Sequence, residues 1–135
     1  MSHSNLHIIE LFFDAYGKKD MNAIKNVMDI NVSWTFNGSH PLSGTKKGID
    51  NVIAFFDKME NIMGRSNVTS EKMVTGESDT HVIECQHVFT DRDDGKNIDH
   101  HICILWNFKD GKIISGTHFF ADPESVNWFF NAVIK

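Results

Sequence analysis

The chain has 135 residues, of which 41% are hydrophobic and 23% are charged, and its formal net charge is −5 at pH 7. This length suits a single domain over residues 1–135, and the composition is that of a globular protein with a sizeable core. Lysine and arginine form no run or stripe, and no apolar run approaches the roughly 18 residues of a membrane helix, so we expect neither nucleic acid nor membrane as a partner.

The two cysteines, Cys85 and Cys103, both fall within predicted strands. They form no framework of many cysteines, which favours reduced thiols. The N-terminal apolar stretch LHIIELFF is short, is interrupted by Glu10 and lacks a basic leader, so it is not typical of a signal peptide. Together these features predict a cytoplasmic protein.

The first half of the chain alternates between helices and one strand. Apolar residues at helical spacing predict a helix after Ser4 that ends near Gly17, and a second, short helix after Asp20. The segment 31–36, NVSWTF, alternates in polarity and predicts a strand, while NGSHPLSGTKKG after it predicts a loop. A third helix is expected over about 47–63.

The second half predicts a meander of strands closed by a helix. In the tail, Asp122 is expected to cap a helix whose first residue is Pro123. Helices segregated from a run of antiparallel strands indicate an α+β fold, with the helices packed on one face of a curved sheet. The four expected strands lie near 67–76, 79–90, 97–109 and 112–121.

Two turns determine which side chains share a sheet face. Asp-Gly at 94–95 favours a two-residue turn, which places His87 opposite Ile102 and Phe89 opposite His100.

The turn at 109–111 permits two registers. A two-residue turn would set even positions of one strand against odd positions of the next. A three-residue turn with Gly111 left-handed pairs Phe108 with Lys112 and keeps even against even. We favour the latter, because the even positions of both strands are the less polar set.

In that register His87, His100 and His118 share one otherwise apolar face. A histidine can act as a general acid or base near neutral pH, although each could equally be a core residue. The spacing matches no metal motif, and the outer two imidazoles would lie roughly 10 Å apart, so we expect no metal and no cofactor. Asp122 could serve as a helix cap or as an acidic group at the edge of a pocket.

The order of elements, the loop HPLSGTKKGIDNVIAFF and the closing pattern WNFKDGKIISGTHFFAD resemble the SnoaL-like polyketide cyclases and ketosteroid isomerase-like proteins, within the nuclear transport factor two-like superfamily. The resemblance covers nearly the whole chain. It implies a cone-shaped (cystatin-like) fold, in which a strongly bent antiparallel sheet wraps on three helices around a deep apolar pocket. It also implies a homodimer formed through the outer sheet face.

The resemblance does not extend to the steroid isomerase machinery. The position of that family's aspartate base falls on Thr35, its oxyanion-hole tyrosine on Phe12, and its protonated aspartic acid near Ile104. The acid–base candidates that remain are His118, His87 and Asp122. The pocket lining implied by the resemblance and the predicted register is Trp34, Phe36, Phe56, Phe89, His100, Ile102, Trp106 and Phe120.

We therefore expect a small apolar molecule, cyclic or carbonyl-bearing, to bind in the cone. The chemistry would be cofactor-independent isomerisation, cyclisation or dehydration, with His118 or His87 moving a proton. The alternative is a non-catalytic ligand-binding or dimerisation module of the same fold. A histidine with a free ring nitrogen facing an open cavity would favour the enzyme over the module.

Overall fold

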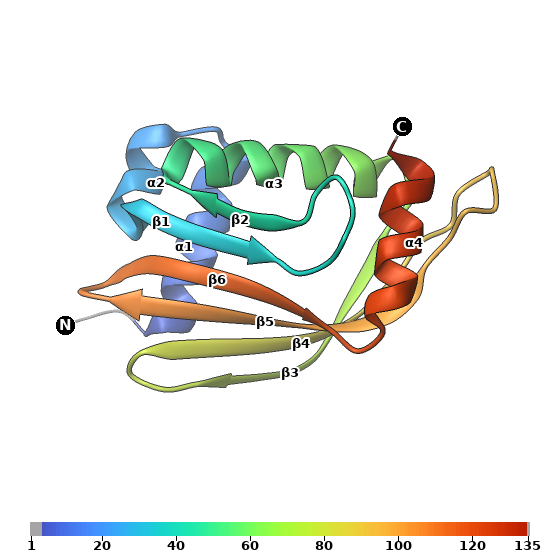
Figure 1. Ribbon diagram of the computed structural model, residues 1–135. Coiled ribbons are helices and arrows are strands. Elements are labelled where there is room, and N and C mark those ends of the chain that lie inside the picture. The colour runs from blue at the N-terminus through green and yellow to red at the C-terminus, as the bar shows by residue number, and fades with distance from the viewer. Residues whose placement is uncertain (1–3, 135) are drawn as a thin grey trace.

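A computed structural model describes residues 4–134 and shows helices packed against one six-stranded sheet (Figure 1). The helices are α1 (Asn5–Gly17), α2 (Met21–Val27), α3 (Ile49–Gly64) and α4 (Pro123–Val133). The strands are β1 (Met28–Phe36), β2 (Gly44–Lys47), β3 (Thr69–Glu77), β4 (His81–Phe89), β5 (Asp99–Lys109) and β6 (Lys112–Phe120).

The helix starts follow from side-chain caps that the sequence predicts. The Ser4 hydroxyl accepts a hydrogen bond from the His7 backbone N–H at 3.2 Å, and Asp20 caps α2 in the same way. At α4, the Asp122 carboxylate accepts from the Ser125 N–H at 3.2 Å, ahead of Pro123 in the first turn. These caps satisfy N–H groups that have no partner within the helix.

The sheet order is β2-β1-β6-β5-β4-β3, and it differs from the prediction in two details. The expected loop after β1 contains β2, which forms a hairpin with β1 and covers its outer edge. Strand β6 therefore joins the other edge of β1, where it runs parallel to it, while the remaining pairs are antiparallel. Figure 1 shows β1 and β6 side by side, with α3 lying along the β1–β2 end of the sheet.

The predicted register between β4 and β5 is wrong by one residue. His87 pairs with His101 rather than Ile102, and Phe89 pairs with Asp99 rather than His100. The connecting segment 90–98 is not a simple two-residue turn, because it carries its own network of hydrogen bonds.

The Asn97 side chain stabilises the conformation of the segment 90–98. Its side-chain oxygen accepts from the Thr90 hydroxyl at 3.0 Å and from the Arg92 N–H at 2.6 Å, while the Thr90 N–H donates to the Ile98 carbonyl at 3.0 Å. The one-residue shift turns every β4 side chain to the opposite face of the sheet. Alternate residues from Val82 to Val88 therefore point inward, whereas His87 and Phe89 point outward.

The β5–β6 hairpin has the expected inward face but a different turn. Lys109 pairs with Lys112, and both Asp110 (φ 53°) and Gly111 (φ 76°) are left-handed, as a two-residue type I′ turn requires. A bulge in β6 then leaves Ile114 without a partner in β5. Further along the two strands, even-numbered residues of β5 pair with even-numbered residues of β6. Ile113, not Ile114, consequently lies in the core.

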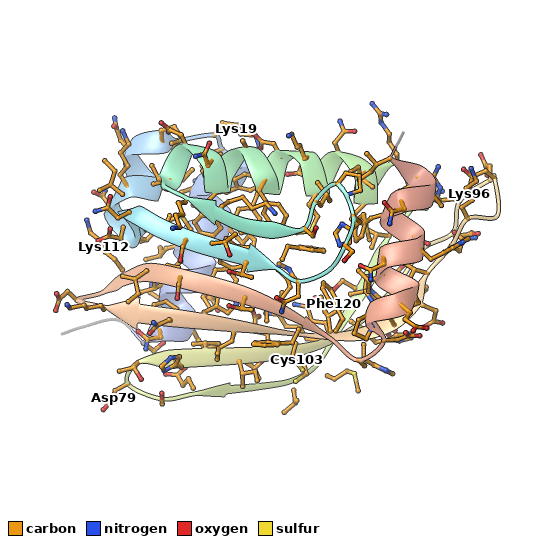
Figure 2. The ribbon with its side chains drawn as sticks, in the orientation of Figure 1. Lys19, Asp79, Lys96, Cys103, Lys112 and Phe120 are labelled. Atoms are coloured by element: carbon orange, nitrogen blue, oxygen red, sulfur yellow. The ribbon has the colours of Figure 1, made fainter. Side chains whose placement is uncertain are left out.

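The two faces of the sheet differ in what they carry. Phe120 belongs to the inner, helix-covered face, and Cys103 to the outer one, where its Sγ lies 2.8 Å from that of its cross-strand partner Cys85 (Figure 2). This contact and burial raise the pKa of Cys103 to about 11. Within residues 4–134, no helix combines the length and apolar character needed to cross a membrane.

Candidate active site

A cavity of about 460 Å³ opens between the inner sheet face and helices α1, α3 and α4. This volume falls within the range of small-molecule sites, and the walls are almost entirely apolar. From the sheet the lining includes Trp34, Phe36, Ser70, Gln86, Val88, His100, Ile102, Ile104, Trp106, His118 and Phe120. From the helices it includes Phe13, Tyr16, Phe56, Met59, Glu60, Met63 and Phe130.

The structure brings together most of the residues that the sequence analysis selected. His118 and seven of the eight predicted lining residues surround the cavity; the seven are Trp34, Phe36, Phe56, His100, Ile102, Trp106 and Phe120. The exception is Phe89, which the register places on the outer face. Of the three proposed acid–base residues, His87 and Asp122 also lie elsewhere.

His87 takes part in a cluster of charged groups on the outer sheet face. Its Nε2 lies 2.5 Å from an Asp99 carboxylate oxygen, and its Nδ1 lies 3.3 Å from Glu71. The hydrogen bond to Asp99 raises the pKa of His87 above its usual value. The prediction that His87 shares a face with His118 is therefore wrong, because one residue of register separates the two faces.

Asp122 is occupied at the start of α4. Its carboxylate caps the helix through Ser125 and does not line the cavity. Strand β6 ends two residues earlier at Phe120, so the inward alternation of the strand does not reach position 122.

His118 is held by a hydrogen bond from Trp34. The two strands run side by side, and the indole Nε1–H donates to His118 Nδ1 at 2.9 Å. An indole N–H can only donate, so Nδ1 must be the unprotonated nitrogen and Nε2 must carry the proton. This Nε2 makes no hydrogen bond to any residue from 4 to 134.

The imidazole of His118 is neutral at physiological pH. Burial lowers its pKa to about 3, and the positive charge of Lys46 acts in the same direction, as would a proton on His100. His118 therefore offers the cavity a hydrogen-bond donor without a positive charge. A neutral imidazole of this kind can polarise a carbonyl group, as it does in triosephosphate isomerase.

His100 provides a second polar group in the cavity. Only 8% of it is exposed, and its Nδ1 is buried without a hydrogen-bond partner among the described residues. Burial lowers its pKa to about 4, so it is neutral as well. The Phe120 ring lies nearly parallel to both imidazoles, with centroids 6.0 Å from His100 and 6.2 Å from His118, so the two histidines mark separate polar points along one wall.

Part of the helical wall consists of residues that the sequence did not predict in the lining. Met59, Glu60 and Met63 line the cavity together with Phe56, and their spacing of three, four and seven residues is a helical signal that could have found them. Tyr16 of α1 also lines the cavity, which the sequence did not predict. Its hydroxyl donates to Asp57 at 2.7 Å, and burial together with this bond raises its pKa.

Glu84 is a buried carboxylate that the predicted register had placed on the outer face. It accepts from Trp106 Nε1 at 2.7 Å and forms an ion pair with Lys72 at 3.0 Å. Both carboxylate oxygens are thus engaged, and Glu84 does not line the cavity. Its role in this geometry is to hold the Trp106 indole in place.

Comparison with known proteins matches residues 9–116 to the model of the SnoaL-like domain. This chain belongs to the SnoaL-like family. An uncharacterized protein of Mycobacterium tuberculosis is 27% identical over 94% of this chain and 96% of its own length.

Solved structures share the fold of this chain. The protein Bal32a, from a soil-derived mobile gene cassette, superposes with a TM-score of 0.76 at 26% identity, covering 93% of this chain and 95% of its own. A Xanthomonas campestris protein of unknown function with a cystatin-like fold gives the same TM-score at 21% identity, covering 96% and 99%.

In this SnoaL-like domain, the position expected to match the steroid isomerase base carries no acid–base group. Thr35 points to the outer face, where its hydroxyl lies 2.9 Å from that of Thr45. Phe12 is fully buried outside the cavity lining, and Ile104 lines the cavity without a polar atom to offer. No group of three or more histidine, cysteine, aspartate or glutamate residues within 4–134 has the geometry to hold a metal ion.

Proposed function

We propose that this SnoaL-like protein binds a small, neutral, carbonyl-bearing ring compound in its cone cavity. We propose further that it catalyses cofactor-independent isomerisation, cyclisation or dehydration of that compound. The observation that carries the proposal is the unpartnered Nε2–H of His118 in an apolar cavity. There it would donate to the carbonyl oxygen and stabilise the negative charge that develops when a neighbouring carbon gives its proton to His100 or to a water molecule.

His100 supports a second contact at the other end of the same wall. A neutral imidazole has one donor and one acceptor nitrogen, so it can accept a proton from carbon or a hydrogen bond from a hydroxyl group. The separation of His100 and His118 by the Phe120 ring suits a ligand with oxygen atoms at both ends of a flat apolar body.

Proton exchange measures this activity without knowledge of the natural substrate. 2-Tetralone is a neutral bicyclic ketone whose hydrogens next to the carbonyl exchange with solvent through the enol. We expect the protein in D₂O to accelerate the loss of these proton signals, followed by NMR. Prodan, a neutral naphthalene ketone, measures occupancy independently, because its emission shifts to shorter wavelength in a dry cavity.

The two readouts separate the alternatives. Prodan binding with accelerated exchange supports the enzyme. Prodan binding without exchange supports the non-catalytic ligand-binding module instead. The lack of an acid–base group at Thr35, whose side chain points to the outer face, also favours this module. Absence of both signals contradicts any role for the cavity in binding such ketones.

We also propose that two copies pair through the outer sheet face. Val74, Ile83 and Phe119 lie on this face with exposed fractions of 60%, 41% and 47%, an unusual set of apolar side chains to leave in water. Leu105 lies among them, paired with Ile83 and Thr117.

A charge in the middle of this face should separate the copies. We expect Leu105→Glu to sediment as a monomer at a concentration where the unmodified protein sediments as a dimer, because the carboxylate would lose its water in the interface. Lys109→Glu, at the end of the same strand, is the control and should leave the dimer intact. A dimer that persists in Leu105→Glu would place the interface on another surface.

A further inference from the structure

We propose that Trp34 is a positioning residue that locks His118 in its neutral Nε2–H form, so that the site selects a ligand group able to accept a hydrogen bond. The lock is a property of the protein alone. Only its use in selecting a ligand rests on the function proposed above. Gly116 is also required, because its lack of a side chain leaves the Trp34 indole the space to reach His118.

The Trp34 indole is packed against two other aromatic rings. Its ring centroid lies 4.9 Å from that of Phe56 and 4.8 Å from that of Trp106, and both contacts are edge-to-face. Trp34 itself has no exposed surface. Its N–H is therefore held toward His118 by packing against these two rings, and a rotation would bury an unpaired donor.

The pairing of β6 with β1 and β5 brings the Trp34 indole to His118. Trp34 lies directly opposite Gly116, and Gly116 in turn lies opposite Trp106, so the two indoles meet over a position without a side chain. A Cβ atom at Gly116 would lie 2.1 Å from Cζ3 of Trp34. His118 follows two residues later on the same face of β6, within reach of the indole N–H.

The hydrogen bond from Trp34 disfavours the other tautomer and the protonated form of the His118 imidazole. The Nδ1–H tautomer and the imidazolium would each point an N–H at the indole N–H, which leaves two donors facing each other in a dry site. Lys46 and His100 are the ionisable groups whose charge acts on the pKa of His118, and a positive charge on either disfavours the cation further, while Glu60 and Tyr16 line the same cavity without a hydrogen bond to His118. No carboxylate among residues 4–134 makes a hydrogen bond to His118 that could offset this.

Nitrogen NMR reports the tautomer directly, since protonated and unprotonated imidazole nitrogens have well-separated ¹⁵N shifts. In ligand-free protein labelled at histidine, with the His118 signals assigned by their loss in His118→Asn, we expect an unprotonated Nδ1 and a protonated Nε2. The pattern should not change between about pH 5 and pH 8, a range in which an ordinary histidine titrates. A protonated Nδ1 anywhere in this range contradicts the lock.

The variant Trp34→Phe tests the cause. We expect the Nδ1 shift of His118 to move toward the average of the two tautomers, and prodan affinity to fall by up to about tenfold, the equivalent of one lost hydrogen bond. Trp128→Phe is the matched control: it removes the indole N–H of an exposed tryptophan on α4, outside the cavity lining, and should leave the His118 shifts in place.

Each outcome has a separate meaning. If His118 keeps the wild-type shifts in Trp34→Phe, burial alone sets the tautomer and Trp34 has no positioning role. If both Trp variants change the shifts equally, the effect is general repacking and the proposal also fails. If the shifts behave as expected while 2-tetralone does not exchange, the lock stands and the catalytic function fails.

Discussion

His118→Asn will reduce the rate of 2-tetralone exchange by about 10²–10³-fold, the usual effect of removing one donor from a developing oxyanion. The asparagine side-chain oxygen can take the place of Nδ1 and accept from Trp34, but nothing in the shorter side chain replaces Nε2–H. Because the buried indole keeps an acceptor, we expect the melting temperature to stay near its wild-type value, whereas the affinity for prodan should fall by up to about tenfold with the loss of the Nε2–H donor. Exchange kinetics by NMR and thermal unfolding by circular dichroism measure the two effects.

The chain contains a matched control for this substitution. His87→Asn makes the same change in a strand of the same sheet, but on the outer face, where His87 pairs with Asp99 and Glu71. The exchange rate of this variant should equal that of the wild type. Unchanged exchange in His118→Asn would remove His118 from the mechanism, and a large loss of stability in that variant would mark it as a structural core residue.

Gly116→Ala will lower the free energy of unfolding by about 3 kcal/mol, the upper part of the range for overpacking a core. The new Cβ would lie 2.1 Å from Cζ3 and 2.4 Å from two further ring atoms of Trp34. Neither partner can yield at low cost, because the glycine belongs to a central strand and the indole is enclosed by Phe56 and Trp106. Denaturant unfolding monitored by tryptophan fluorescence gives the free energy.

A second strand glycine shows what the same change costs without the clash. At Gly76, on the edge strand β3, an added Cβ would make only an ordinary contact of 3.6 Å with Ile83. Gly76→Ala should therefore change the free energy of unfolding by less than about 1 kcal/mol in either direction. Equal effects at both positions would show that loss of glycine in the sheet, and not the Trp34 contact, sets the cost.

Local chemistry in the sequence determined the helices and the inward face of the last hairpin. Ser4, Asp20 and Asp122 cap helices because their side chains reach N–H groups only three residues away. Alternation along β5 and β6 placed His100, Trp106 and His118 toward the helices, because one buried face allows only one parity. That parity was correct even though the turn at 110–111 was not.

Longer-range contacts decided which of the candidate residues meet. The bonds that Asn97 makes across the 90–98 loop shift β4 by one residue, which turns His87 outward and brings Glu84 inside. The β1–β6 pairing sets Trp34 against Gly116 and so fixes which nitrogen of His118 carries its proton. A sequence pattern specifies on which face a residue lies, but the proton position on an imidazole depends on the one atom that touches it, and only the folded chain brings residue 34 to residue 118.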